Sequence, residues 1–374
     1  MGESMRKQTE IDLGEAMKKQ KDVAMFLAGK LINTTKSRNS NLVFSPASIN
    51  TVVTMAAATS GDKRLRSSLL SLLRSSSMDE LNTVFREITS VVLADGSASG
   101  GPKIAVANGF WIEQSLPFSP AYKDLLVNFF KSDFRQVNFR SKAEQVRKEV
   151  NKWVSDHTNG LIKDVLTSGS VTNLTNWIYG NALYFKGAWE NEFDKSLTVE
   201  TNFHLLNGES VSTPFMRSYE SQFIKAYDGF KVLKLPYRQG RDDTNRQFSM
   251  YFYLPDEKDG LNNLLQRMTS TGGFLDSHIP KDREEVGAFR IPKFKIEFGF
   301  EFPKSSYQKA LIEIDEEGTE AAAVTFLAAT CTSSAYEPER IDFVADHPFI
   351  FLIREDITGT VLFAGQICDP SKSV

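Results

Sequence analysis

The residues of this chain best suited to acid–base or metal chemistry are its four histidines: His157, His204, His278 and His347. Imidazole titrates near neutral pH and is the commonest metal ligand among side chains. None of the four stands at metal-ligand spacing or follows a nucleophile motif. The loop at residues 95–102 narrowly misses a nucleophile elbow, because Ala98 occupies the position that the reactive serine needs. We therefore expect no catalytic residues, no metal and no cofactor, and we predict that the protein is not an enzyme.

A different kind of chemistry, a change of secondary structure, is indicated by residues 316–325, EEGTEAAAVT. The segment follows residues 310–314, an apolar and β-branched run that predicts a strand. Extended as a strand, the segment has one small and nearly uncharged face: Thr319, Ala321, Ala323 and Thr325. Glu320 falls on the other face, where it stays in water. Glu-Ala-Ala-Ala is also a good helix start, and both interpretations stay open. A segment that is helix or loop in one state and strand in another is what loop insertion requires.

Several stretches resemble the serpins, the serine protease inhibitor family, and they occur in the family's order. They match its opening helix, the core of its main sheet, the hinge of its reactive loop and its C-terminal strand pair. The stretches are residues 41–49 (NLVFSPASI), 181–189 (NALYFKGAW), 316–323 (EEGTEAAA), 343–351 (FVADHPFIF) and 359–365 (GTVLFAG). Within the family, the sequence most resembles the plant serpins, at residues 101–103 (GPK), 106–109 (VANG) and 227–233 (YDGFKVL).

The resemblance implies a mixed α/β (α+β) serpin fold. Such a fold has a large central β-sheet A, further sheets, about eight or nine helices and a mobile reactive-centre loop. Residues 1–374 would then form a single domain, with the reactive-centre loop at about 316–338. The chain has 374 residues, which is long enough for one large domain or two ordinary ones.

The resemblance also implies a function: inhibition of a protease by a suicide-substrate mechanism. Family spacing from Gly318 places the reactive bond at about Thr332–Ser333. A protease that cleaves there would be held as an acyl-enzyme while the loop inserts into the main sheet. Thr332 or Cys331 at the cleavage position implies a serine or cysteine protease that prefers a small uncharged residue. We expect a monomer that binds neither nucleic acid nor membranes.

The resemblance assigns roles to further residues. The hinge would comprise Glu316, Gly318, Thr319, Glu320, Ala321, Ala322 and Ala323. At the top of the main sheet, where insertion begins, Lys293 and Glu316 match a family ion pair next to Trp189; an exposed pair of little energetic value is the alternative. Ser45, Ser48 and Asn181 would lie where the central strands part. The remaining position, commonly a histidine in the family, is Gln308 here.

One segment departs from the family. Residues 288–302 read as one long strand, and serpins follow this strand with a few dozen residues, including a helix, before the strand that leads to the hinge. Here residues 302–307 make the connection almost directly. A tight hairpin at residues 303–306 can join two antiparallel neighbours without changing the topology. The shortened connection keeps an alternative open, namely a non-inhibitory serpin-fold protein that is a protease substrate or a binding protein. A chain that fails to fold stably is the third possibility.

Composition and local patterns complete the expectations. The sequence is 41% hydrophobic and 24% charged with a net charge of −3, which is typical of globular proteins and gives no reason to expect nucleic acid or anionic lipid as a partner. The polar N-terminus has no signal-peptide pattern and only two cysteines occur, so we predict a cytoplasmic or nucleocytoplasmic location. Apolar spacing predicts a helix within residues 8–35, and Ser45 and Ser77 are predicted N-caps.

Overall fold

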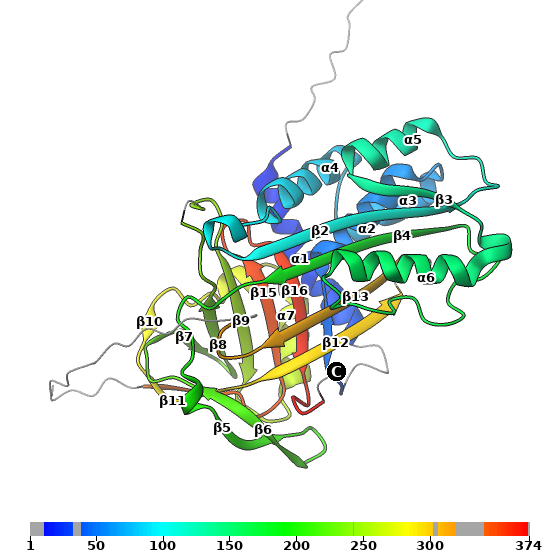
Figure 1. Cartoon of the computed structure of the whole chain (residues 1–374). Helices are drawn as coiled ribbons and strands as arrows, with labels where there is room; N and C mark the ends of the chain where they lie inside the picture. The colour runs from blue at the N-terminus through cyan, green and yellow to red at the C-terminus, as the bar shows by residue number, and fades with distance from the viewer. Residues whose placement is uncertain (1–10, 33–38, 242, 302–305, 319–339, 373–374) are drawn as a thin grey trace, which may run out of the picture.

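Three β-sheets organise the protein, as described by a computed structural model for residues 11–32, 39–241, 243–301, 306–318 and 340–372. The main sheet has five strands in the order β12 (Phe294–Glu301), β13 (Ser306–Ile314), β4 (Trp177–Lys186), β2 (Lys103–Glu113) and β3 (Ser132–Val137). Its long strands β2 and β4 pair antiparallel over ten residues each and lie side by side in Figure 1. β12 pairs antiparallel with β13, and β13 runs parallel to β4.

The other two sheets form the lower part of the molecule in Figure 1. The larger has the order β1 (Leu42–Phe44), β16 (Val361–Ile367), β15 (Phe349–Glu355), β9 (Phe248–Pro255), β8 (Phe230–Pro236), β7 (Gln222–Tyr227) and β10 (Arg283–Glu284). The smaller has the order β14 (Ile341–Val344), β11 (Val286–Pro292), β6 (Ser210–Arg217) and β5 (Val199–His204). Three neighbouring strands of the larger sheet, β9, β15 and β16, are buried along their whole length, as expected for strands covered on both faces.

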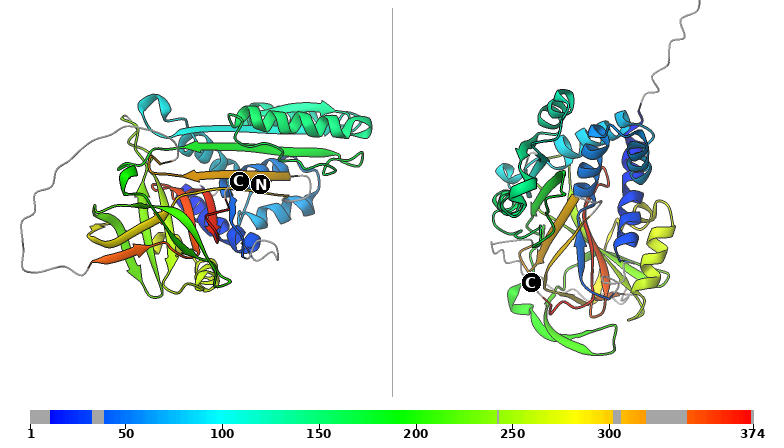
Figure 2. Two further views of the ribbon diagram at one scale, coloured as in Figure 1. Left: turned by 60° about the horizontal axis from the view of Figure 1, so that its bottom comes forward. Right: turned by 90° about the vertical axis from the view of Figure 1, so that its right-hand side faces the viewer.

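Eight α-helices occur in the described residues, in agreement with the predicted fold class. They are α1 (Leu13–Ile32), α2 (Pro46–Thr59), α3 (Lys63–Leu72), α4 (Met78–Glu87), α5 (Pro120–Asp124), α6 (Phe139–His157), α7 (Leu261–Ser270) and α8 (Phe274–Ser277). Figure 2 shows α6 on one face of the main sheet and the N-terminal helices on the other. Within the described ranges, no helix combines the length and the apolar character needed to cross a bilayer.

Alternation along the strands separates the two faces of the main sheet. Ile178 and Ala182 of β4 pack with Trp153 of α6, whereas Tyr179 packs with Met55 of α2. Because successive side chains of a strand point to opposite faces, even-numbered residues of β4 face α6 and odd-numbered residues face the core behind the sheet. The same alternation fixes the face toward which each side chain of a strand added beside β4 would point.

The predicted local elements at the N-terminal end are confirmed. The helix expected within residues 8–35 is α1. Ser45 caps α2, its Oγ accepting the Ser48 N–H at 3.1 Å, and Ser77 caps α4 by accepting the Glu80 N–H at 3.1 Å. Caps of this kind depend on residues three apart, which is why sequence patterns locate them.

The prediction of one long strand over residues 288–302 is wrong. The chain forms two strands, β11 and β12, which separate at Lys293 and belong to different sheets. The N–H of Lys293 donates to the Pro214 carbonyl at 2.9 Å, so this residue still contacts the smaller sheet as the chain crosses to the main one. The prediction that β12 and β13 are antiparallel neighbours is confirmed, and the expected turn at residues 303–306 lies largely outside the described residues.

Candidate functional site

The main sheet is incompletely paired between β13 and β4. These parallel strands pair only near their N-terminal ends, at Ser306 with Tyr179 and at Tyr307 with Gly180. We call these the lower ends of the two strands, and their C-terminal ends the upper ends. Above these two pairs, a cavity of about 250 Å³ lies between the strands. Its lining residues include Leu183, Phe185, Leu311 and Glu313 from the strands and Leu161 and Ile162 from the segment after α6. The sheet is therefore open at its top, and closed at its bottom, along one seam.

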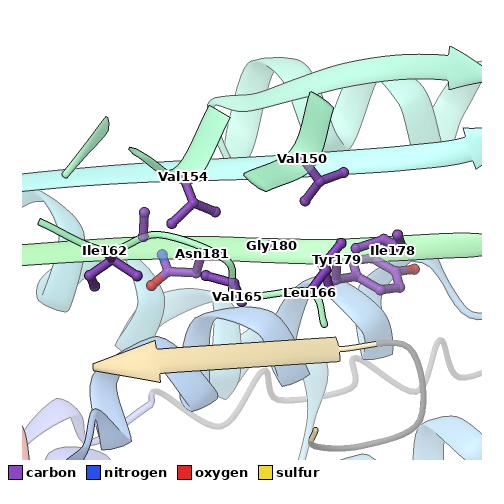
Figure 3. Close-up of a pocket in the computed structure, with 10 residues that line it drawn as sticks. Val150, Val154, Ile162, Val165, Leu166, Ile178, Tyr179, Gly180 and Asn181 are labelled. Carbon is purple, nitrogen blue, oxygen red and sulfur yellow. The ribbon is translucent and has the colours of Figure 1, made fainter. Parts of the chain in front are cut away.

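On the α6 side, the lower half of β4 is closely covered. Figure 3 shows Val150 and Val154 of α6 pointing toward β4, with Ile162 and Leu166 beside it. The cavity that these residues enclose is only about 20 Å³, which is room for about one water molecule. The open space along the seam is therefore concentrated at the upper ends of the strands.

A tight turn closes the upper end of β13. The N–H of Asp315 donates to the Gly318 carbonyl at 3.2 Å, and the Gly318 N–H donates back at 3.4 Å. Gly318 also forms an antiparallel bridge with Ala188, just beyond the end of β4. It has φ of +122°, and a Cβ there would lie 2.5 Å from the Gly187 carbonyl oxygen. Only glycine fits this position, because the backbone is left-handed and another chain passes against it.

Glu316, inside this turn, has both of its carboxylate oxygens occupied. Lys293 Nζ donates to Oε2 at 2.7 Å, and Thr198 Oγ1 donates to Oε1 at 2.7 Å. The Glu316 side chain is 5% exposed, whereas that of Lys293 is 34% exposed. Burial alone would raise the pKa of Glu316, but the hydrogen bonds from Lys293 and Thr198 outweigh it and leave the pKa below its ordinary value. The structure thus places Lys293 and Glu316 together, with one charge buried and the other in contact with water.

Trp189, in the segment after β4, holds the turn at residues 315–318 in place by two hydrogen bonds. Its indole N–H donates to the Asp315 carbonyl at 3.0 Å, and its backbone N–H donates to the Glu317 carbonyl at 3.1 Å. The buried ring stacks on Tyr237, with centroids 4.7 Å apart. An exposed ion pair between Lys195 and Glu317 adds a further contact. Burial raises the pKa of Asp315 at the base of the turn.

The remaining predicted residues are distributed along the sheet and behind it. Ser45 and Ser48 are buried at the N-terminus of α2. Asn181 donates through Nδ2 to Asn108 Oδ1 at 2.8 Å, across the β4–β2 pair. Gln308 lies on β13 opposite Phe300 of β12, directly above the last pair that β13 makes with β4. Thr319 to Ala323 of the predicted hinge, and Thr332 and Ser333 of the predicted reactive bond, lie outside the described residues.

Three further residues, which the sequence analysis did not single out, belong to the site. Thr198 donates the second side-chain hydrogen bond to the Glu316 carboxylate, and Phe193 donates its N–H to the Glu316 carbonyl at 2.8 Å. Asn108 accepts the hydrogen bond that orients the Asn181 amide. They come from strands and connections that lie dozens of residues away in sequence from their partners. No local pattern marks such residues, because each is defined by a single long-range contact.

The histidines take part in local structural contacts. His157 Nδ1 contacts the Trp153 carbonyl at 2.8 Å, and His347 lies between the Asp346 carboxylate and the Pro255 carbonyl, both at 2.8 Å. No cluster of three or more potential metal ligands was found among the described residues.

The chain matches one family model and is similar to curated proteins and solved structures of that family. The family model described as "Serpin (serine protease inhibitor)" matches residues 18–305 and 303–370, two segments that meet at the shortened β12–β13 connection. Serpin-Z2 of Arabidopsis thaliana is 64% identical over 98% of this chain and 92% of the relative. A "Probable non-inhibitory serpin-Z5" of the same plant is 64% identical over 96% of this chain and 86% of the relative. The solved structure of Arabidopsis AtSerpin1 in its native stressed conformation is 48% identical, with a TM-score of 0.86 over 96% of this chain and 99% of that one.

Proposed function

The chain belongs to the serpin family, and from that premise we propose that it inhibits a protease by trapping it as a covalent acyl-enzyme. The protease's hydroxyl or thiol attacks the carbonyl carbon of about Thr332. The bond to Ser333 breaks, and the Ser333 nitrogen takes up a proton and leaves. The protease is then joined to Thr332 by an ester or thioester. Inhibition requires that the loop enter the main sheet before water hydrolyses this bond.

The observation that carries the proposal is the position of Gly318. It is bridged on one side to Asp315 at the end of β13 and on the other to Ala188 beyond β4. Gly318 is therefore already the first rung of a strand placed between the two and antiparallel to both. Residues that continue from it in extended conformation would run down the unpaired seam, where no strand among the described residues lies between β13 and β4.

The chemistry of the loop residues supports the same mechanism. Continued from Gly318, odd-numbered residues share the face of Phe185 and Ile312, which are buried in the core. These residues are Thr319, Ala321, Ala323 and Thr325, all small. Glu320 falls on the opposite face, beside Lys186. Small side chains toward the core and an acid toward water match the two environments that the seam offers.

We further propose the biological setting. The whole chain acts as one domain, with its reactive loop at about residues 316–338. The target is a serine or cysteine protease that accepts a small uncharged residue, and the inhibitor is a monomer in the cytoplasm or nucleocytoplasm.

A second candidate function rests on one feature of the sequence, the shortened connection at residues 302–307 between β12 and β13. If the sheet with this connection cannot hold the loop, a protease would cleave and leave, and the protein would be a substrate or a binding protein. One relative carries "Probable non-inhibitory" in its name, which supports this second candidate.

The two candidates are separated by incubation with a panel of elastase-like and papain-like proteases, followed by denaturing electrophoresis. We expect a covalent complex with at least one protease, and none with Thr319→Arg, because that substitution directs a charge into the core. Glu320→Arg is the matched control, since it carries the same charge on the water-facing side, and it should still form the complex. A wild-type protein that every protease merely cleaves, with no gain in thermal stability afterwards, would establish the non-inhibitory function instead.

A further inference from the structure

Two arginines lie directly opposite each other in the smaller sheet. Arg290 of β11 and Arg217 of β6 are register partners in this antiparallel pair. The Cβ atoms of such partners are about 4.5–5.5 Å apart, so the two side chains leave the sheet close together and on the same face. Like charges at directly opposite positions destabilise a sheet. The pairing of β6 with β11 alone therefore gains nothing from these two residues.

The arginines lie on the face of β11 and β6 that is opposite to the hydrophobic core. Phe289 and Ile291, the neighbours of Arg290 in the chain, belong to the core and are at most 4% exposed. Successive side chains of a strand point to opposite faces, so Arg290 and its partner Arg217 point away from these two residues. Both arginines are half-buried. Each positive charge is therefore partly shielded from water, which strengthens its attraction for an anion.

Within the described ranges, neither Arg217 nor Arg290 forms an ion pair, and the Nε of Arg217 is buried without a hydrogen-bond partner. Acids near these strands have other contacts: Glu285 pairs with Arg340 at 3.3 Å, and Asp342 accepts a backbone N–H of β11 at 2.7 Å. A guanidinium cannot lose its proton to relieve the repulsion. Two permanent charges and one buried donor are thus left for a ligand.

We propose that Arg217 and Arg290 form a binding site for a phosphate group. A guanidinium donates parallel hydrogen bonds to an oxyanion, and phosphate has enough oxygens to accept from two guanidinium groups at once. A phosphate ester carries a charge of about −1.5 to −2 at pH 7, which balances both arginines, whereas a carboxylate balances one. A free phosphate ion and a phosphorylated small molecule both present this group. The bound group would join β6 to β11, and the site does not depend on the proposed inhibition.

The experiment uses the full chain and inorganic phosphate as the probe, at constant pH and ionic strength with chloride as the replacement ion. The unfolding temperature of wild type should rise with the logarithm of the phosphate concentration above half-occupancy, because the ligand binds only the folded state. Arg217→Met and Arg290→Met should each weaken phosphate binding about tenfold or more, since each removes hydrogen bonds from a charged donor. Comparison with these variants also subtracts the general stabilising effect of phosphate on proteins.

Arg340→Met is the matched control. It removes the same charge from a side chain that is 55% exposed and already paired with Glu285, so its response to phosphate should equal that of wild type. A second measurement separates a ligand site from a structural role. Without phosphate, Arg290→Met should unfold at the wild-type temperature or above it, because the substitution removes a contact between like charges.

The source of the phosphate group is tested with O-phosphoserine as a second probe. Stabilisation by both probes would support a phosphorylated ligand, and stabilisation by inorganic phosphate alone would support the free ion. Three results would overturn the proposal. They are the absence of a phosphate response in wild type, an equal response in Arg290→Met, and a loss of stability in both arginine variants that does not depend on phosphate.

Discussion

The contact between Lys293 and Glu316 offers a quantitative test of how the turn at residues 315–318 is held. The perturbation is a double-mutant cycle made of Lys293→Met, Glu316→Gln and the double variant. Lys293→Met removes the charge but keeps much of the side-chain volume, and Glu316→Gln keeps the shape of the carboxylate. The cycle isolates the interaction between the two side chains from their separate effects on packing.

The magnitude follows from the burial of the two partners. Lys293→Met leaves the Glu316 carboxylate, 5% exposed, with Thr198 as its one remaining side-chain donor among the described residues. A fully buried pair broken in this way costs about 3–5 kcal/mol. Lys293 is 34% exposed, so water screens the attraction, and we reduce the expected coupling free energy to about 1–2 kcal/mol. The pair Lys295–Glu313 is the control, because its contact is also 2.7 Å but the partners are 34% and 49% exposed; it should couple by less than about 1 kcal/mol.

The assay is urea-induced unfolding of the intact chain at neutral pH and at successively lower pH. The pKa of Glu316 is lowered in the folded protein, so its contribution is present above the ordinary glutamate range and is lost as the pH falls through the lowered value. Coupling should therefore be largest at neutral pH and vanish in acid. Additive single-variant effects at pH 7, or equal coupling in the two pairs, would show that burial of Glu316 does not strengthen the contact.

Three further outcomes are expected. Gly318→Ala should destabilise the intact protein by about 2 kcal/mol or more in urea unfolding, because φ of +122° and the Gly187 carbonyl both oppose a Cβ; an unchanged midpoint would contradict the described turn. Hydrogen bonds from Lys19 and from Ser75 and Ser76 lower the pKa of Glu80 to about 2 against the effect of burial. The stabilising advantage of wild type over Glu80→Gln, about 2–3 kcal/mol, should therefore hold above pH 4.5 and disappear toward pH 2, whereas a constant difference would be contrary to this assignment. Lys195→Ala, which removes a side chain that is 66% exposed, should leave the unfolding midpoint unchanged, and a clear shift would show that its contact with Glu317 matters.

The elements that the sequence predicts correctly are those fixed by near neighbours. The caps at Ser45 and Ser77 each join residues three apart. The antiparallel pairing of β12 and β13 follows from a connection too short for any other arrangement. The contact between Lys293 and Glu316 spans 23 residues, and its residues were found through a family resemblance rather than from any local pattern.

The failures have two causes. The prediction of one strand over residues 288–302 missed a shift in the alternation, because the apolar residues are odd-numbered through Ile291 and even-numbered from Phe294. The strand breaks at this shift, at Lys293, and β11 and β12 have partners in different sheets. Alternation reports which residues are buried, and it carries no information about which sheet buries them. Thr198 illustrates the second cause. It contacts Glu316 across 118 residues of sequence, and nothing near it distinguishes it from an exposed threonine.

Whether this chain inhibits or is merely cleaved depends on a small free-energy difference along the seam. A residue paired on both sides gains about two backbone hydrogen bonds, each with a net value of about 1 kcal/mol. Fixing its backbone costs about 1–2 kcal/mol, so two-sided pairing is balanced or slightly favourable. A residue paired on one side gains about one such bond against the same cost, so one-sided pairing does not stabilise a strand. Insertion is therefore favoured along the open seam, beginning at the turn already formed at Gly318. A strand that enters further must replace the two direct pairs, Tyr307 with Gly180 and Ser306 with Tyr179, and the balance between inhibition and cleavage depends on this exchange.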